Sequence, residues 1–292
     1  MEKIVVVGGS GFIGSHVVDL LDRKGFKVII FDINKSRYLK NNYTMIVGDI
    51  LDEAAIRKAV KDASVVYHFA GVVDIEQSYK SPLNTMNINL IGTCNVLEAC
   101  RKENVRRFIF ASSIYTCSSA GSFYKVSKLA CEKLIEEYNK AFDLNYTILR
   151  IGSTYGPRAS DLNIFKKMIS QALTDGRITC KDTRDRLREY INVEDVATAC
   201  VHILSSEYKN RHIVLKGNQM LSMGHCIDII KELFNNEITV DFIETENHLH
   251  YNKIPYSYQP NRAVCLRLNH YHDLGDGLLD VIHEFEDGSC ND

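Results

Sequence analysis

The chain has 292 residues, 45% of them hydrophobic, a formal charge of −2 and a pI near 6.6. A chain of this length can bury a core of its own, and its near-neutral charge gives no overall attraction for nucleic acid or an anionic membrane. We therefore expect a small-molecule partner, with no nucleic acid and no membrane involved.

The apolar runs are too short for a signal peptide or for a membrane span, which needs about 20 apolar residues, so we expect a cytoplasmic location. Nine cysteines are an odd number and include no C-x-x-C pair, which predicts neither a disulfide framework nor a zinc site. The ten histidines have no metal-binding spacing, and we expect no metal.

The first 150 residues alternate short apolar runs, rich in β-branched residues, with longer amphipathic patterns. Strands are predicted at 4–7, 27–31, 44–47, 65–69, 107–111 and 146–150, and helices at 12–23, 53–60, 83–102 and 124–142. Repeated βαβ units of this kind predict a doubly wound α/β fold around a buried parallel sheet.

A glycine-rich turn, Gly8-Gly9-Ser10-Gly11-Phe12-Ile13-Gly14, joins the first predicted strand to the first helix. Glycines permit a tight turn and a close approach of the backbone to a ligand, and the start of a helix presents free N–H groups to a pyrophosphate. The motif predicts a Rossmann-type dinucleotide site, although a glycine-rich turn without a ligand would show the same pattern.

Asp32 ends the second strand, near the spacing after Gly14 that is typical of the carboxylate that binds ribose hydroxyls. This favours NAD over NADP, because the 2′-phosphate of NADP would meet the negative charge of Asp32. Lys35 and Arg37 lie nearby and keep NADP as an alternative.

Tyr124 and Lys128 stand four residues apart near the start of a predicted helix, so their side chains share one face. A lysine ammonium, together with the positive ring of the cofactor, favours the phenolate and would lower the tyrosine pKa toward working pH. This is the arrangement that a phenol base needs.

Ser112 and Ser113 follow the strand predicted at 107–111. Ligands of open α/β sheets bind at the carboxyl ends of the strands, where a serine hydroxyl can bond the same sugar oxygen that the tyrosine deprotonates. We predict a catalytic role for Ser113; a serine at this place can equally be a turn or cap residue.

Gly156-Pro157 breaks the chain after the sixth strand, and helices then alternate with isolated short strands. We expect a Rossmann domain that binds NAD at 1–155 and a smaller α/β lobe, mainly for substrate, at 156–292. The segment near 189–206, with a helix expected over 194–204, is the part of this lobe that we expect to pack back on the first domain.

Together these motifs resemble the extended short-chain dehydrogenase/reductase superfamily, and within it the NAD-dependent nucleotide-sugar epimerase/dehydratase family, with UDP-glucose 4-epimerases as the most similar branch. Further matches follow in order at 48–50, 68–71, 89–93, Glu132, 149–158 and 188–197. The resemblance covers nearly the whole chain.

The resemblance implies roles for individual residues. Catalytic residues would be Ser113, Tyr124 and Lys128. Cofactor contacts would come from Gly8, Gly11, Phe12, Ile13, Gly14, Asp32, Asp49, Ile50, Phe69, Ala70, Gly71, Asn89, Tyr124 and Lys128. Substrate contacts would come from Ser113, Ser153, Asn163 and Arg188, with Arg188 on the pyrophosphate. It also implies a homodimer formed by the helices predicted at 83–102 and 124–142.

The reaction implied is the C4 epimerisation of a UDP-hexose through a transient 4-keto sugar. Family 4,6-dehydratases and UDP-xylose-forming decarboxylases carry acidic residues just after the catalytic Ser or Thr, where this chain has Ile114 and Tyr115, so we do not expect those reactions. Two other departures bear on the epimerase itself. The segment between Ser113 and Tyr124 is about half the usual length, and Ser153 replaces a frequent asparagine.

Two other functions remain open at this stage. An NAD(P)-dependent reductase or dehydrogenase of a nucleotide-sugar or another ketone or alcohol would share the fold and consume its cofactor. A non-catalytic NAD-binding sensor or scaffold would keep the cofactor site without turnover, but the intact Ser113, Tyr124 and Lys128 argue against it.

Overall fold

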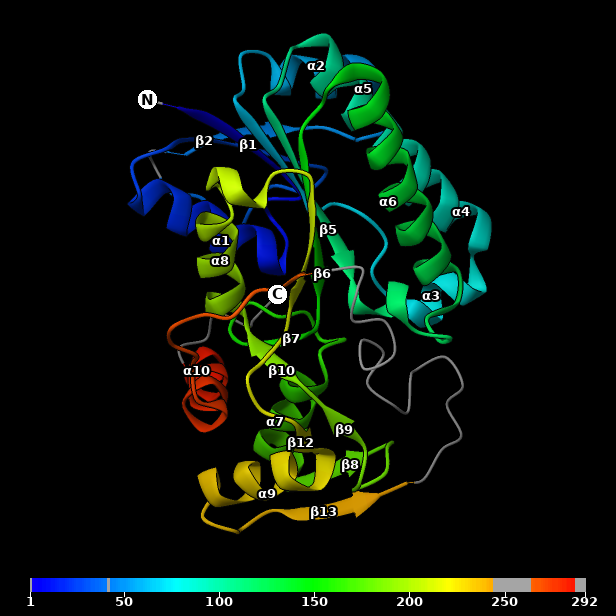
Figure 1. The fold of residues 1–292 in the computed structure, drawn as a ribbon. Helices are drawn as coiled ribbons and strands as arrows, with labels where there is room; N and C mark the ends of the chain where they lie inside the picture. The colour runs from blue at the N-terminus through cyan, green and yellow to red at the C-terminus, as the bar shows by residue number, and fades with distance from the viewer. Residues whose placement is uncertain (1, 41–42, 244–263, 287–292) are drawn as a thin grey trace.

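A parallel sheet forms the centre of the computed structural model, which describes residues 2–40, 43–243 and 264–286 (Figure 1). Its eight strands lie in the order β14-β11-β6-β5-β4-β1-β2-β3. They are β1 (Lys3–Val7), β2 (Lys27–Asp32), β3 (Thr44–Val47), β4 (Val65–His68), β5 (Arg107–Ser113), β6 (Tyr146–Ile151), β11 (Arg211–Leu215) and β14 (Val264–Cys265). Every neighbouring pair is parallel.

Helices cover both faces of this sheet. On one face lie α1 (Phe12–Arg23) and α8 (Val193–His202), and on the other lie α2 (Glu53–Val60), α5 (Gly92–Lys102) and α6 (Ser122–Phe142). Alternate residues of β1 serve the two faces: Ile4 and Val6 pack toward α1, and Val5 and Val7 toward α2 and α5. Burial on both faces explains why these strands read as continuous apolar runs. The doubly wound α/β prediction is confirmed.

The strand order reverses at β1, which has β2 on one side and β4 on the other. Such a switch point leaves a crevice at the carboxyl ends of the two central strands, because their following connections leave on opposite faces. The glycine-rich turn after β1 and the 69–71 segment after β4 both lie at this edge.

The helix predicted at 83–102 is divided in the structure into α4 (Pro82–Met86), a π-helical turn η1 (Asn87–Ile91) and α5. A π turn inserts an extra residue and re-aims the side chains around it. Here it accompanies bonds from Thr93 Oγ1 (2.5 Å) and Cys131 Sγ (3.2 Å) to the Asn89 carbonyl. The other short elements around the large sheet are α3 (Ile75–Lys80) and the 3₁₀ turns η2 (Ile114–Cys117) and η3 (Ser206–Tyr208).

The remaining elements form a smaller lobe below the carboxyl edge of the sheet (Figure 1). Its helices are α7 (Ile164–Asp175), α9 (Met223–Leu233) and α10 (Leu274–Glu286). Three two-stranded sheets pair β7 (Ser153–Tyr155) with β10 (Tyr190–Asn192), β9 (Leu187–Arg188) with β12 (Leu221–Ser222), and β8 (Arg177–Cys180) with β13 (Thr239–Phe242). A separate apolar cluster that includes Phe165, Ile227 and Leu278 fills this lobe.

The two parts of the chain interleave. Helix α8 packs on α1, and β11 and β14 extend the large sheet beyond β6. In space, residues 193–215 and 264–265 thus belong to the part built around the large sheet. The division at residue 155 into an NAD-binding domain and a mainly substrate-binding lobe stays a proposal about function.

The eight cysteines within the described residues are free, and five of them are buried; Cys290 lies outside that part of the chain. Within the same ranges, no three His, Cys, Asp or Glu side chains are grouped so that they would hold a metal ion. No helix of the described residues has the length and apolarity to cross a membrane.

Candidate active site

The turn between β1 and α1 is packed so tightly that two of its glycines cannot carry a side chain. Gly8 has φ +83°, and a Cβ there would lie 2.4 Å from the Ala70 backbone nitrogen. A Cβ on Gly14 would lie 2.1 Å from the carbonyl oxygen of Gly8. The first turn of α1 is thus held directly against the turn that follows β1.

The amino end of α1 has the properties of an anion site. Its N-cap is Gly11, which gives no side-chain cap, and the first turn carries no acidic residue. Phe12 and Ile13 open the helix with backbone N–H groups that have no partner inside the helix. Free N–H groups and the positive end of the helix dipole suit the pyrophosphate of a dinucleotide.

Asp32, at the end of β2, lies beside this turn. Its carboxylate accepts the Ser10 N–H at 2.9 Å and the Asn34 N–H at 3.0 Å. A carboxylate has about four acceptor sites, so lone pairs remain for the ribose hydroxyls that the sequence predicts as its ligands. Lys35 and Arg37 are exposed nearby.

Two more segments border the crevice. Asp49 is exposed and accepts the Leu51 N–H at 2.9 Å, while Ile50 is buried against Gly92, where a Cβ would lie 2.4 Å from Ile50 Cδ1. After β4, Phe69 and Ala70 both donate their N–H groups to the Val7 carbonyl. These bonds join the chain after β4 to the end of β1, at the edge where the glycine-rich turn begins.

Asn89 is buried and its amide is used by the protein itself. Oδ1 accepts the Val72 N–H at 2.7 Å, and Nδ2 donates to the Val72 carbonyl at 3.0 Å and to Ser127 Oγ at 2.9 Å. Gly71, with φ +151°, leaves room for Oδ1, since a Cβ there would lie 2.7 Å from that atom. The structure therefore gives Asn89 a positioning role, and its predicted cofactor contact remains a prediction.

The three predicted catalytic residues come together at the carboxyl end of β5. The side chains of Tyr124 and Ser113 are hydrogen-bonded, and both are buried. Lys128 Nζ donates to the Ala111 carbonyl at 2.9 Å and lies 4.7 Å from the centre of the Phe110 ring and 5.9 Å from that of Tyr124. One turn of α6 thus holds phenol and ammonium together, as their spacing predicts.

Burial controls the electrostatics of this group. It raises the pKa of Tyr124, against a smaller lowering by the Ser113 hydrogen bond, and it lowers the pKa of Lys128 to about 8. The lowered tyrosine pKa expected from Lys128 is therefore not found in the protein alone. Both charged forms are disfavoured because both groups are removed from water, and no carboxylate is bonded directly to Lys128 in the described chain.

A buried ion pair supports the strand beneath these residues. Glu132, one turn after Lys128, is fully buried and pairs with Arg150 of β6 through contacts of 3.0 and 2.7 Å. Its Oε1 also accepts the hydroxyl of Ser112 at 2.6 Å. The sequence marked Glu132 only by family resemblance; its structural role depends on a partner 18 residues away in another element.

The short segment after Ser113 brings a second aromatic ring against the ring of Tyr124. Tyr115, in η2, meets the Tyr124 ring edge-on with centroids 6.4 Å apart. Gly121, with φ +103°, makes this possible, because a Cβ there would lie 2.8 Å from Tyr115 Cδ1. Ser78 Oγ accepts the Tyr124 N–H at 3.2 Å and anchors the start of α6, a contact that no local sequence signal predicts.

Three of the four predicted substrate residues lie in the smaller lobe, and the fourth, Ser113, ends β5. Ser153 starts β7 opposite Tyr190 of β10, and Arg188 is buried in β9. Asn163 caps α7 by accepting the N–H groups of residues 165 and 166, and its Nδ2 donates to the Thr154 carbonyl at 2.9 Å. Most of the Asn163 amide is thus committed to the fold.

Comparison with known proteins agrees with this geometry. A model of the NAD dependent epimerase/dehydratase family matches residues 4–215. The chain belongs to this family. The NAD cofactor and the resemblance to extended short-chain dehydrogenases/reductases are thereby confirmed.

Several family members show the range of similarity. The chain is 30% identical to a putative UDP-glucose 4-epimerase of Methanocaldococcus jannaschii, with 78% of this chain and 81% of that protein covered. It is 27% identical to a dTDP-D-glucose 4,6-dehydratase of Dictyostelium discoideum, over 68% of this chain and 54% of that protein. Among solved structures, the UDP-N-acetylglucosamine 4-epimerase of Methanobrevibacter ruminantium has a TM-score of 0.84 at 24% identity, with 98% and 99% covered. The family thus includes both epimerases and dehydratases.

The glycine-rich turn yields a first prediction. Gly14→Ala should cost about 1 to 3 kcal/mol of unfolding free energy and weaken NAD binding, because the new Cβ must push the Gly8 carbonyl away. Gly11→Ala is the matched control, since its Cβ would lie at an ordinary 3.4 Å from the same oxygen. Urea unfolding and NAD titration measure both effects; equal stability of the two variants would contradict the packing argument.

The buried ion pair yields a second prediction. Glu132→Gln should lower the unfolding free energy by about 3 to 5 kcal/mol, because Arg150 keeps a buried charge without a counterion. Glu136→Gln, one turn further along α6, removes a more exposed carboxylate and should cost about 1 kcal/mol or less. Urea unfolding of the two variants gives the comparison, and similar losses would refute the assignment.

The depressed pKa of Lys128 yields a third prediction. Because this pKa is about 8 in the folded chain and 10.5 ordinarily, the unfolded chain binds more protons between these values, and stability must rise with pH across that window. Relative to Lys128→Met, the wild type should gain up to about 1.4 kcal/mol per pH unit from pH 8 upward. Urea unfolding of both proteins at several pH values tests this, and parallel pH profiles would speak against it.

Proposed function

We propose that the chain catalyses the C4 epimerisation of a nucleotide-activated hexose, with a UDP-hexose as the substrate. The observation that carries this proposal is the buried contact of Tyr124 with Ser113 beside Lys128, at the carboxyl edge where the cofactor turn also lies. Only one proton-transfer group is needed for an epimerisation of this kind, and Tyr124 is that group.

The protein's own residues have defined tasks in this mechanism. The phenol oxygen of Tyr124 takes the proton from the 4-hydroxyl of the sugar and later returns it, and Ser113 bonds the same sugar oxygen. Lys128 favours the phenolate by its charge, so that proton removal becomes possible near neutral pH. NAD, when bound, supplies the hydride acceptor and donor, and its positive nicotinamide ring adds to the charge beside Tyr124.

The residues that follow Ser113 in the sequence favour epimerisation over dehydration. Elimination of water from a sugar requires a base for a carbon-bound proton and an acid for the leaving hydroxyl. The segment 114–121 contains no Asp or Glu, and Glu132, which accepts the hydroxyl of Ser112, is fully buried and paired with Arg150. This supports the epimerase over the 4,6-dehydratases of the same family.

The choice of a UDP-sugar is supported by similar proteins. The relative from Methanocaldococcus jannaschii is described as a putative UDP-glucose 4-epimerase, and a similar structure from Bacillus cereus is a UDP-glucuronic acid 4-epimerase in complex with UDP-glucuronic acid and NAD. In our proposal Arg188 binds the substrate pyrophosphate, while Ser153 and Asn163 lie against the nucleotide.

A turnover assay tests the proposal and supplies the fourth prediction. UDP-glucose, UDP-galactose and their N-acetylated forms are incubated with the protein and NAD, the sugars are followed by proton NMR, and the cofactor by its reduced absorbance band. We expect the C4 epimer without lasting reduced cofactor. Tyr124→Phe should retain NAD and lose about 10²- to 10⁴-fold of the rate.

Other outcomes would replace the proposal. Stoichiometric reduced cofactor would indicate a dehydrogenase or reductase, and a Tyr124→Phe variant as active as wild type would remove the phenol from the mechanism. Binding of NAD with no turnover of any nucleotide-sugar would favour a sensor or scaffold.

We further propose that the chain acts as a cytoplasmic homodimer. Helices α3, α4 and α6 pack side by side with η1 (Figure 1). Several apolar side chains of these elements are exposed. They are Tyr79, Leu83, Ile91, Phe123, Val126 and Leu129. The side chain of Leu83 is 84% exposed and would face water in a monomer.

The fifth prediction concerns this surface. Leu83→Lys should convert the dimer into a monomer, because a charge would be buried at the centre of the contact. Leu162→Lys is the matched control, because Leu162 is likewise a highly exposed leucine, at 70%, but lies in the smaller lobe. Light scattering gives the mass in solution; a monomeric wild type, or an unchanged Leu83→Lys variant, would contradict the proposal.

A further inference from the structure

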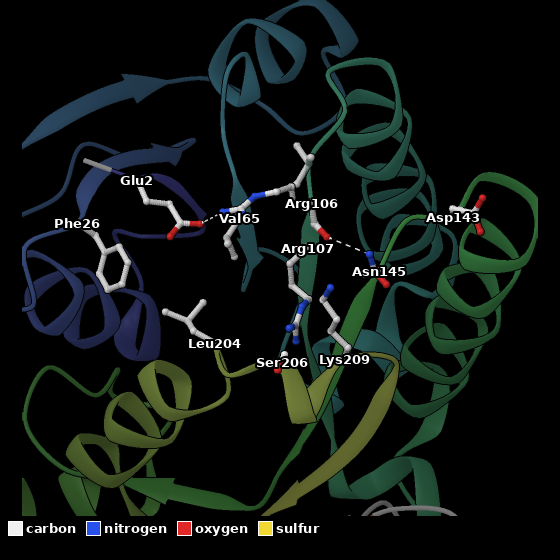
Figure 2. A pocket seen from close by; sticks show the side chains of 11 residues that line it. Glu2, Phe26, Val65, Arg106, Arg107, Asp143, Asn145, Leu204, Ser206 and Lys209 are labelled. Carbon is white, nitrogen blue, oxygen red and sulfur yellow. Dashed lines mark hydrogen bonds and ion pairs between the residues drawn. The ribbon is translucent and has the colours of Figure 1, made fainter.

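A pocket lies at the edge of the sheet opposite to the one where Ser113, Tyr124 and Lys128 meet. Val65 and Arg107 open β4 and β5, and Glu2 and Asn145 precede β1 and β6, so these lining residues belong to the amino ends of the strands (Figure 2). The pocket has a volume of about 450 Å³. That size lies within the range of small-molecule sites in proteins.

Arg107 is the unusual residue of this pocket. It is only 5% exposed, yet within the described residues it forms no ion pair. Its Nη1 donates to Thr147 Oγ1 at 2.8 Å and to the Ile203 carbonyl at 3.5 Å, and Nη2 donates to the Ser205 carbonyl at 3.3 Å. These contacts use three of the five guanidinium N–H groups, and the charge has no neutralising partner.

Part of this arrangement has a structural explanation. The carbonyls of 203 and 205 follow the end of α8, where a cation is favourable because of the helix dipole. The dipole corresponds to only about half a charge, so it does not neutralise a buried guanidinium. Burial accordingly lowers the pKa of Arg107.

Two other cations line the same hollow. Lys209 is exposed and, in the described part of the chain, its ammonium has neither an ion pair nor a hydrogen bond. Arg106 is paired with Glu2 (Figure 2). With Asp143 as the remaining acid, the lining residues carry three positive and two negative charges and leave a net positive pocket.

Four of the other lining residues are apolar: Phe26, Val65, Val105 and Leu204. The remaining two, Asn145 and Ser206, are polar and uncharged. A ligand that fits both parts carries an oxyanion, which a guanidinium binds through paired N–H groups, on an apolar body. We propose that this pocket binds a small organic anion, a carboxylate or phosphate attached to an apolar group, through Arg107 and Lys209.

Methyl NMR tests this proposal. The protein is labelled at Ile, Leu and Val methyl groups and saturated with NAD and UDP, so that the phosphate-binding turn and the nucleotide site are occupied. Benzoate and phenyl phosphate are then titrated, with benzyl alcohol as the uncharged probe. We expect saturable shifts of the Val65, Val105 and Leu204 signals with both anions. The anion with the lower dissociation constant shows whether the pocket prefers a carboxylate or a phosphate.

Variants separate the charge from the apolar wall. Lys209→Ala should weaken anion binding by about threefold to fivefold, and Arg107→Met by about tenfold or more. Lys167→Ala, which removes an exposed lysine on α7, should leave it unchanged. If Arg107→Met does not fold, Lys209→Glu decides, because a reversed charge should abolish binding.

The proposal is overturned if benzyl alcohol produces the same shifts as the anions, if neither anion gives saturable shifts at these methyl groups, or if Lys209→Ala and Lys167→Ala have equal effects.

Discussion

The parallel direction of the central strands determines where the chemistry of this protein lies. Because every neighbouring pair in the large sheet is parallel, all strands end at the same edge, and the chain after β1, β2, β4, β5 and β6 emerges there. The reversal of strand order at β1 leaves a crevice at that edge. The cofactor turn, Asp32 and Ser113 are neighbours for this reason, although they are far apart in the sequence.

Burial of charge is the second constraint, and two neighbouring turns of α6 meet it differently. Glu132 and Arg150 neutralise one another within the core, and Glu132 also accepts the hydroxyl of Ser112, the neighbour of Ser113. Lys128 is buried without such a direct partner, so its ammonium is available to the phenol and to whatever binds beside it. Burial of the Lys128 ammonium is unfavourable in the free protein. The same buried charge would stabilise a negative phenolate at Tyr124.

Local patterns predicted much of this arrangement. The six apolar runs of the first 150 residues appear as strands within two residues of their expected bounds, and α1 and α2 match the expected helices, because buried parallel strands and amphipathic helices have strong periodic signals. The helix at 83–102 was continuous in the prediction, yet a π turn interrupts it around Asn89. Around that turn Cys131 donates to the Asn89 carbonyl, and the Asn89 side chain accepts the Val72 N–H. Contacts between residues so far apart in the sequence cannot be predicted from a short stretch of it.

The candidate site was predictable to the same degree. Tyr124 and Lys128 share a helix, so their proximity follows from spacing alone, whereas the contacts of Ser78 and Tyr115 with Tyr124 depend on loop conformation. The commitment of the Asn89 and Asn163 amides to backbone groups also required the fold. Likewise, Arg107 reads as an ordinary strand residue until its neighbours in β6 and after α8 are known.

In our proposal Tyr124 moves protons only to and from a sugar oxygen, and no second base removes a carbon-bound proton. Turnover of the UDP-hexose in deuterated water, followed by mass spectrometry and proton NMR of the recovered sugar, tests this directly. We expect an epimer that carries no deuterium on any carbon. Deuterium at a ring carbon or at C6 would show that a carbon acid is deprotonated, and would contradict it.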